Sequence, residues 1–187
     1  SATGGNTFSN IPLPAVQLGG SVASTGSHSF TFTGNTVSNT IANRAGSVNV
    51  QARNSQTIVS TISGNTHTNA GGGVINIGAD EASLHRATVD ANTLTAPVSN
   101  AILGANDDAN RLRLLVNNNN ISNAAADGIE VANFGGVGVS ELDSVITNNI
   151  VSGHSLNGAV AFLGGIVAFN FEDNGCQAIT GNNVSGN

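Results

Sequence analysis

The chain has 187 residues, of which 9% are charged, and its formal net charge is −6. With five Arg and no Lys it lacks the basic stripe that neutralises nucleic-acid phosphates, so no nucleic-acid partner is expected. No apolar run approaches the roughly 20 residues that cross a bilayer, and we therefore predict no membrane span in this chain.

The composition is biased towards small polar residues, with 28 Asn and 24 Gly. Such a bias is also found in disordered chains, but Val, Ile and Leu recur regularly from end to end, which disordered segments lack. The sequence shows no linker or change of composition. We therefore predict one ordered domain over residues 1–187.

A seven-residue motif centred on asparagine recurs about every thirty residues. It reads GGNTFSN from Gly4, TGNTVSN from Thr33 and SGNTHTN from Ser63, and more divergent copies begin near Asp90, Asn117, Thr147 and Thr180. Aligning the copies gives spacings of 29, 30, 27, 27, 30 and 33 residues. The aligned residues are Asn6, Asn35, Asn65, Asn92, Asn119, Asn149 and Asn182.

Apolar residues occupy fixed places around each of these asparagines. Three residues before it come Phe32, Ile62, Val89, Val116, Ile146 and Ile179. Two residues after it come Phe8, Val37, His67, Leu94, Ile121, Val151 and Val184. A third stretch follows some ten residues later, with Val16 and Leu18, Val48 and Val50, Ile75 and Ile77, Ile102, Ile129 and Val131, and Ala159 and Ala161. Short β-branched runs bounded by Gly and Asn predict strands, three in each repeat.

The fold predicted from this pattern is all-β: a single-domain parallel β-helix of about six coils, each with 27 to 33 residues and three strands. Helical repeats of similar length need sustained i, i+3, i+4 patterns, which the turn-forming residues interrupt. The recurrent asparagine is placed at a tight corner, where we expect it to adopt positive φ. Stacked in successive coils, its side-chain amides should form a hydrogen-bonded ladder.

The GNTVSN-like segments, the asparagine corner and the coil of about thirty residues resemble the right-handed parallel β-helix superfamily. That superfamily includes pectate lyases, polygalacturonases, phage tailspikes and autotransporter passengers. The resemblance covers Gly4 to Asn187 and implies right-handedness. It implies no single activity, because the fold serves both catalytic and structural proteins.

Four acidic residues repeat at one place in two neighbouring coils. Asp80 and Glu81 follow Asn65 by fifteen and sixteen residues, and Asp107 and Asp108 follow Asn92 by the same intervals. Stacked carboxylates on adjacent loops offer the oxygen ligands that calcium prefers. The alternative is a solvated loop whose acids are balanced by Arg86 and Arg113, which also stack in this alignment.

The other titratable residues give weaker signals. His67 lies in an otherwise apolar column, which predicts a hydrogen-bonded interior imidazole, whereas His28 and His85 are expected in surface loops. Asp127 and Glu130 flank Ile129 and are expected on the outward side of a strand. The single Cys176 is expected to be a partly buried thiol.

Two functions remain open. The first is a non-enzymatic extracellular structural protein, a surface fibre subunit or an adhesin. Because the first motif begins at Gly4 and the last ends at Gly186, leaving no room for a capping helix, we expect head-to-tail assembly with copies of itself. The second is a β-helix that binds or degrades polysaccharide, although the chain lacks the Trp and Tyr that usually form sugar platforms. No catalytic residue is predicted, and the expected location is extracellular or at the cell surface.

Overall fold

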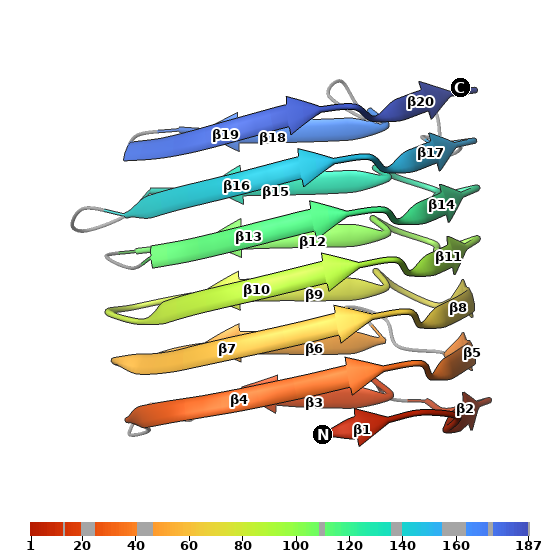
Figure 1. Ribbon diagram of the computed structural model, residues 1–187, viewed down its shortest axis with the longest axis horizontal. Coiled ribbons are helices and arrows are strands. Elements are labelled where there is room, and N and C mark those ends of the chain that lie inside the picture. Colours follow the sequence, from red (N-terminus) through yellow and green to blue (C-terminus); the bar gives the residue numbers. More distant parts are fainter. Residues whose placement is uncertain are drawn as a thin grey trace.

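A computed structural model describes residues 1–12, 14–19, 25–40, 47–108, 111–135, 140–154, 164–171 and 174–186. Over these residues the chain forms strands and no helix. The strands wind into a right-handed parallel β-solenoid whose coils stack in sequence order from the N-terminus to the C-terminus (Figure 1). The predicted parallel β-helix is thus confirmed.

The described strands form three parallel sheets, which we call A, B and C. Sheet A has seven strands: β1 (Ala2–Thr3), β4 (Gly26–Thr33), β7 (Gln56–Ser63), β10 (Leu84–Asp90), β13 (Arg111–Asn117), β16 (Glu141–Thr147) and β19 (Asn174–Thr180). Sheet B has seven: β2 (Thr7–Ser9), β5 (Thr36–Thr40), β8 (Thr66–Ala70), β11 (Thr93–Thr95), β14 (Asn120–Ser122), β17 (Ile150–Ser152) and β20 (Asn183–Ser185). Sheet C has six: β3 (Val16–Gly19), β6 (Val48–Ala52), β9 (Ile75–Ala79), β12 (Ile102–Asn106), β15 (Ile129–Asn133) and β18 (Ile166–Asn170).

Each of the first six coils contributes one strand to every sheet, as the three apolar stretches of each repeat predict, and the last described coil contributes β19 and β20. The corner from sheet A to sheet B is tight: only Gly64 and Asn65 separate β7 from β8. The last strand of sheet C differs from the sequence alignment, because β18 pairs with β15 through Ile129 and Ile166. Ala159 and Ala161, which were expected there, lie outside the described residues.

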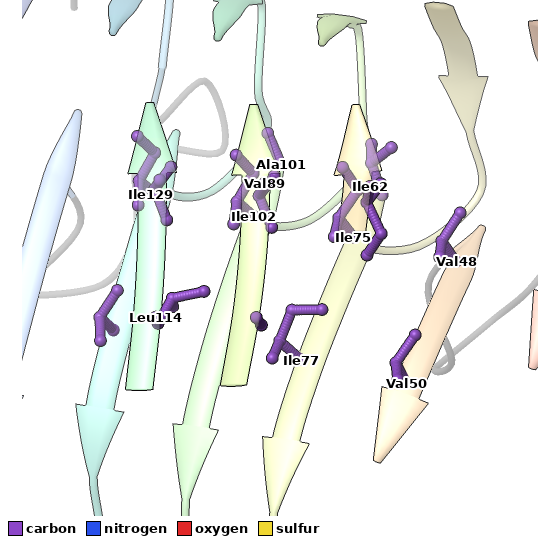
Figure 2. Close-up of a cluster of buried hydrophobic side chains, with 14 of the residues drawn as sticks. Val48, Val50, Ile62, Ile75, Ile77, Val89, Ala101, Ile102, Leu114 and Ile129 are labelled. Carbon is purple, nitrogen blue, oxygen red and sulfur yellow. The ribbon is translucent and has the colours of Figure 1, made fainter. Parts of the chain in front are cut away.

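The core is a set of apolar columns inside the coil. Side chains alternate between the two faces of a strand, so every second residue of a strand points inward. Inward-facing Val48, Ile75, Ile102 and Ile129 of sheet C pack with Ile62 and Val89 of sheet A (Figure 2). All six side chains are fully buried. Each coil therefore covers the inward-facing apolar side chains of the coils next to it, and this burial stabilises the solenoid along its axis.

The recurrent asparagines form the expected ladder at the corner between sheets A and B. From Asn6 to Asn149, each side-chain Nδ2 donates to Oδ1 of the asparagine in the next coil, at 2.8 to 3.2 Å. From Asn35 to Asn149 the backbone N–H donates to the same oxygen, at 2.8 to 3.0 Å. The ladder therefore satisfies a buried backbone group as well as the amide in each of these coils.

The prediction that the ladder asparagines adopt positive φ is wrong. Positive φ occurs instead at the residue immediately before each one: Gly5, Gly34, Gly64, Ala91, Asn118, Asn148 and Gly181. A second such column lies four residues after the ladder, at Asn10, Asn39, Asn69, Ala96, Asn123, Gly153 and Gly186. The motif GNTVSN therefore contains two residues that tolerate the left-handed region, one ladder amide and one inward-facing apolar residue.

A second buried row of amides crosses the last coils at the end of sheet C. Asn106 Nδ2 donates to Asn133 Oδ1, and Asn133 Nδ2 donates to Asn170 Oδ1, both at 3.1 Å. Asn106 and Asn133 are fully buried. This row was not predicted from the sequence, although Asn106 and Asn133 both follow their ladder asparagines by fourteen residues.

Substituting a central ladder residue should lower the stability strongly. Asn92 donates to Ile62 O and to Asn119 Oδ1 and accepts two hydrogen bonds from Asn65. Asn92→Ala removes these four hydrogen bonds and leaves the buried backbone N–H of Asn65 without its partner, so we expect a loss of about 3 kcal/mol in the free energy of unfolding. Urea unfolding followed by circular dichroism measures the change.

Asn39→Gly is the matched control. Asn39 also hydrogen-bonds along the coil axis, to Asn10 and Asn69, but these bonds are exposed and its φ of 50° suits glycine. Its substitution should change the stability by no more than about 0.5 kcal/mol. Equal losses in the two variants would contradict the special role of the buried ladder.

Candidate functional site

A shallow trough of about 520 Å³ lies on the outer face of sheet A. Two outward-facing columns of side chains run along it, one strand after another. The first column is Val59, Arg86, Arg113, Asp143 and Cys176, and the second is Thr61, Thr88, Leu115, Val145 and Ala178. Its lining is mostly apolar. The trough has the size of a small-molecule site and crosses five coils.

Three arginines gather at this face. Arg86 and Arg113 are direct neighbours on β10 and β13, which confirms that they stack. Arg113 Nε lies 3.5 Å from Asp143 Oδ2, and Arg111 pairs with Glu141. The hydrogen bond from Arg111 lowers the pKa of the Glu141 carboxyl. Among the described residues Arg86 has no ion-pair partner, so the group carries an excess of one positive charge.

Cys176 lies at the end of the first column, on β19. Its side chain is exposed, so the expectation of a partly buried thiol is wrong. Cys176 faces outward beside Asp143, and β19 is the last described strand of sheet A, which together explain the exposure.

The four acidic residues follow the strands of sheet C in equivalent positions. The backbone N–H of Asp80 donates to Ala52 O and that of Asp107 to Ala79 O, both at 3.0 Å. Glu81 and Asp108, which follow, both have positive φ. The backbone at Asp107 therefore stacks on that at Asp80, whereas the predicted stacking of the four carboxylates stays a prediction. Asp80 pairs with Arg53 at 3.5 Å, not with Arg86 or Arg113 as the alternative interpretation expected.

Calcium binding by Asp80, Glu81, Asp107 and Asp108 stays a prediction. The described His, Cys, Asp and Glu side chains form no group of three or more that could hold a metal ion. Calcium bound by these four acidic residues should raise the melting temperature, and EDTA should lower it again. Asp107→Asn should remove the effect of calcium. Titration calorimetry without heat, together with an unchanged melting temperature, would remove calcium from consideration.

Asp127 and Glu130 belong to a polar network at the start of sheet C. Asp127 is buried before β15 rather than exposed on the strand, so its predicted placement is wrong. Its Oδ1 accepts from Gly164 N at 2.6 Å, while Asn100 donates to Glu130 and accepts from Asp127 N. Burial raises the pKa of both carboxyls, and the charge of Asp127 raises that of Glu130 further. The network links successive coils, which is a structural role.

His85 was expected on the surface but is fully buried on β10. Its Nδ1 lies 2.8 Å from Gly78 O, and its Nε2 lies 2.8 Å from Ser60 Oγ. Because a carbonyl only accepts, Nδ1 carries the proton and the Ser60 hydroxyl donates to Nε2. Burial lowers the His85 pKa to about 4. The Ser60–His85 pair has the groups of a nucleophile and its base, but neither side chain reaches solvent.

His67 lies inside the coil as predicted, but its expected hydrogen bonds are missing. Both ring nitrogens are buried without a partner among the described residues. The ring lies between Val37 and Leu94 in the inward column of sheet B, and its centroid is 6.3 Å from that of Phe32. Burial lowers the His67 pKa to about 3. An unpaired buried imidazole destabilises the fold.

Replacing His67 should stabilise the protein and weaken its sensitivity to acid. The His67 pKa is 6.5 in the unfolded state and about 3 in the folded state. Protonation of His67 therefore leaves the free energy of unfolding unaffected above pH 6.5 and lowers it by about 1.4 kcal/mol per pH unit between pH 6.5 and 3. His67→Leu should raise the unfolding free energy by about 1 to 2 kcal/mol at pH 7.5 and more at pH 5. Urea unfolding at both values measures the difference from the wild type.

His28→Asn is the control for this experiment, because His28 is a histidine whose side chain is exposed on β4. It should leave the pH dependence of unfolding unchanged. If His67→Leu has the same pH dependence as the wild type, the unpaired imidazole is not a source of acid sensitivity.

Comparison with protein-family models, with curated proteins and with solved structures finds no match to this chain. The assignment as a parallel β-solenoid therefore stands on the strand pairing and the ladder. Among the described residues no helix has the length and hydropathy needed to cross a membrane.

Proposed function

We propose that the protein is a non-enzymatic structural β-solenoid of the cell surface or extracellular space, and that its coils stack end to end on those of a second copy. We also propose that the chain is related to the passenger-type members of the right-handed β-helix superfamily, which its repeats resemble. The observation that carries it is apolar surface on the last described coil. Inward-facing Ile179 and Val184 are 47% and 45% exposed, whereas Ile146 and Val151, one coil below, are 0% exposed.

The ladder supports a defined register for this stacking. At each step from Asn35 to Asn149 an asparagine donates two hydrogen bonds to Oδ1 of the next. A second copy whose Asn6 Oδ1 lies above Asn182 would continue this pattern. The opposite ends are then complementary, which produces a heterologous contact that does not close on itself. The unpaired edges of β18, β19 and β20 would gain parallel partners.

A charged residue on the open coil should block this assembly. The wild-type chain of 187 residues is expected to form rods in electron micrographs, and its sedimentation coefficient should rise with concentration. Val184→Arg places an unpaired charge where the next coil would pack, so it should remain a monomer with an unchanged circular dichroism spectrum.

Val98→Arg is the matched control, since Val98 is 57% exposed but lies on the side of the solenoid, in the connection between β11 and β12. It should assemble like the wild type. A wild-type chain that stays monomeric at every concentration, or equal inhibition by Val98→Arg, would overturn end-to-end stacking.

Polysaccharide binding is the second candidate, and exposed phenylalanines favour it. Phe134 and Phe171 follow β15 and β18 in equivalent positions, where their N–H groups donate to Asn106 O and Asn133 O. Their rings are stacked with centroids 6.2 Å apart, and they are 49% and 62% exposed. Flat exposed rings are able to pack against sugar rings.

The polysaccharide candidate predicts that Phe171→Ala weakens the binding of soluble polysaccharides in affinity electrophoresis, whereas Val98→Ala does not. Unsaturated products from a panel of uronates would add lyase activity to binding. Failure of every polysaccharide to bind would remove this candidate and leave the structural proposal untouched.

A further inference from the structure

The trough on sheet A combines positive charge and apolar surface on one face of an acidic protein. Three of the five arginines of the chain, Arg86, Arg111 and Arg113, lie on its strands β10 and β13. Glu141 and Asp143 on β16 pair with Arg111 and Arg113 from the side of β13 that is opposite to β10 and Arg86. Nothing described in the chain neutralises Arg86.

The position of Arg86 makes its charge costly. In the outward column its neighbours are Val59 on β7 and Arg113 on β13. Neighbouring strands are about 4.8 Å apart, and like charges directly opposite each other on paired strands are destabilising. A bound anion between the two guanidinium groups would remove this repulsion and accept charge-assisted hydrogen bonds from both.

The second column of the trough is apolar beside this charge. Leu115 lies two residues after Arg113 on β13, on the same outward face, and Val145 is its direct neighbour on β16. Both side chains are exposed large apolar groups. On one strand, side chains two residues apart are separated by roughly 6 to 7 Å, so one small molecule spans both columns. An anion without an apolar part would leave Leu115 and Val145 in water.

We propose that the trough binds a small amphiphilic anion, with its carboxylate held between Arg86 and Arg113 and its apolar chain lying over Leu115 and Val145. The volume of about 520 Å³ and the mostly apolar lining suit such a ligand. The four residues of this site lie on the outer face of sheet A, on β10, β13 and β16, and do not include the exposed phenylalanines.

Octanoate is the probe, with 1-octanol and glucuronate as analogues that lack the charge and the apolar chain. Octanoate should produce saturable heat in titration calorimetry and shift the amide resonances of Thr88, Leu115 and Val145. It should also slow the alkylation of Cys176 by iodoacetamide, because this single exposed thiol lines the trough. The two analogues should bind at least tenfold more weakly, 1-octanol because it lacks the charge-assisted hydrogen bonds and glucuronate because it lacks the apolar contact.

Arg86→Gln should weaken octanoate binding about tenfold while the melting temperature stays at or above that of the wild type. Leu115→Asn should weaken it as well, with both charges retained. Arg53→Gln is the matched control, since Arg53 pairs with Asp80 beyond the trough, and it should bind octanoate like the wild type.

The proposal is overturned if octanoate gives no saturable binding or if 1-octanol or glucuronate binds as tightly. It is also overturned if Arg53→Gln and Arg86→Gln weaken binding equally, because the charge of the whole protein, and not the trough, would then attract the anion.

Discussion

The register between neighbouring coils is the constraint on which the rest of the structure depends. A shift of one residue in a parallel pair turns every inward side chain outward, because the side-chain period of a strand is two. The buried asparagine ladder opposes such a shift, since Asn65, Asn92 and Asn119 each fix a backbone N–H and a side-chain amide on the same oxygen of the next coil. Register, more than gross stability, is what these hydrogen bonds specify.

Repeats of unequal length are compatible with this register because the length differences fall outside the ladder corner. Between Asn149 and Asn182 the repeat is 33 residues long, against 27 between Asn65 and Asn92, yet β16 pairs with β19 and β17 with β20 residue by residue. The short corner from sheet A to sheet B keeps two residues in each of these coils. Insertions are tolerated in longer connections because closing a longer loop costs little extra entropy.

The sequence period was sufficient to predict the coil, the three sheets and the ladder, since each depends on columns that recur six or seven times. The period was insufficient where the burial or hydrogen bonding of a residue depends on one particular neighbour and not on a repeated column. The burial of His85 follows from its register with Ile58 and Leu112, and this burial lowers its pKa, while Ser60 and Gly78 supply the hydrogen bonds of its ring. The trough escaped notice because Leu115 and Val145 read as core residues in an apolar run, while the strand pairing places them outside.

In a solenoid, a residue whose type differs from the rest of its column says more about function than the column itself does. Each column has a residue type that the stacked position favours, so a residue of another type contacts neighbours that do not compensate it. His67 between Val37 and Leu94 loses its hydrogen bonds, and Arg86 between Val59 and Arg113 gains a repulsion. The two departures differ in one physical respect: His67 is enclosed, so only the fold bears its cost, whereas Arg86 faces solvent, where a ligand is able to relieve it. A binding site on this fold is therefore expected at an outward departure.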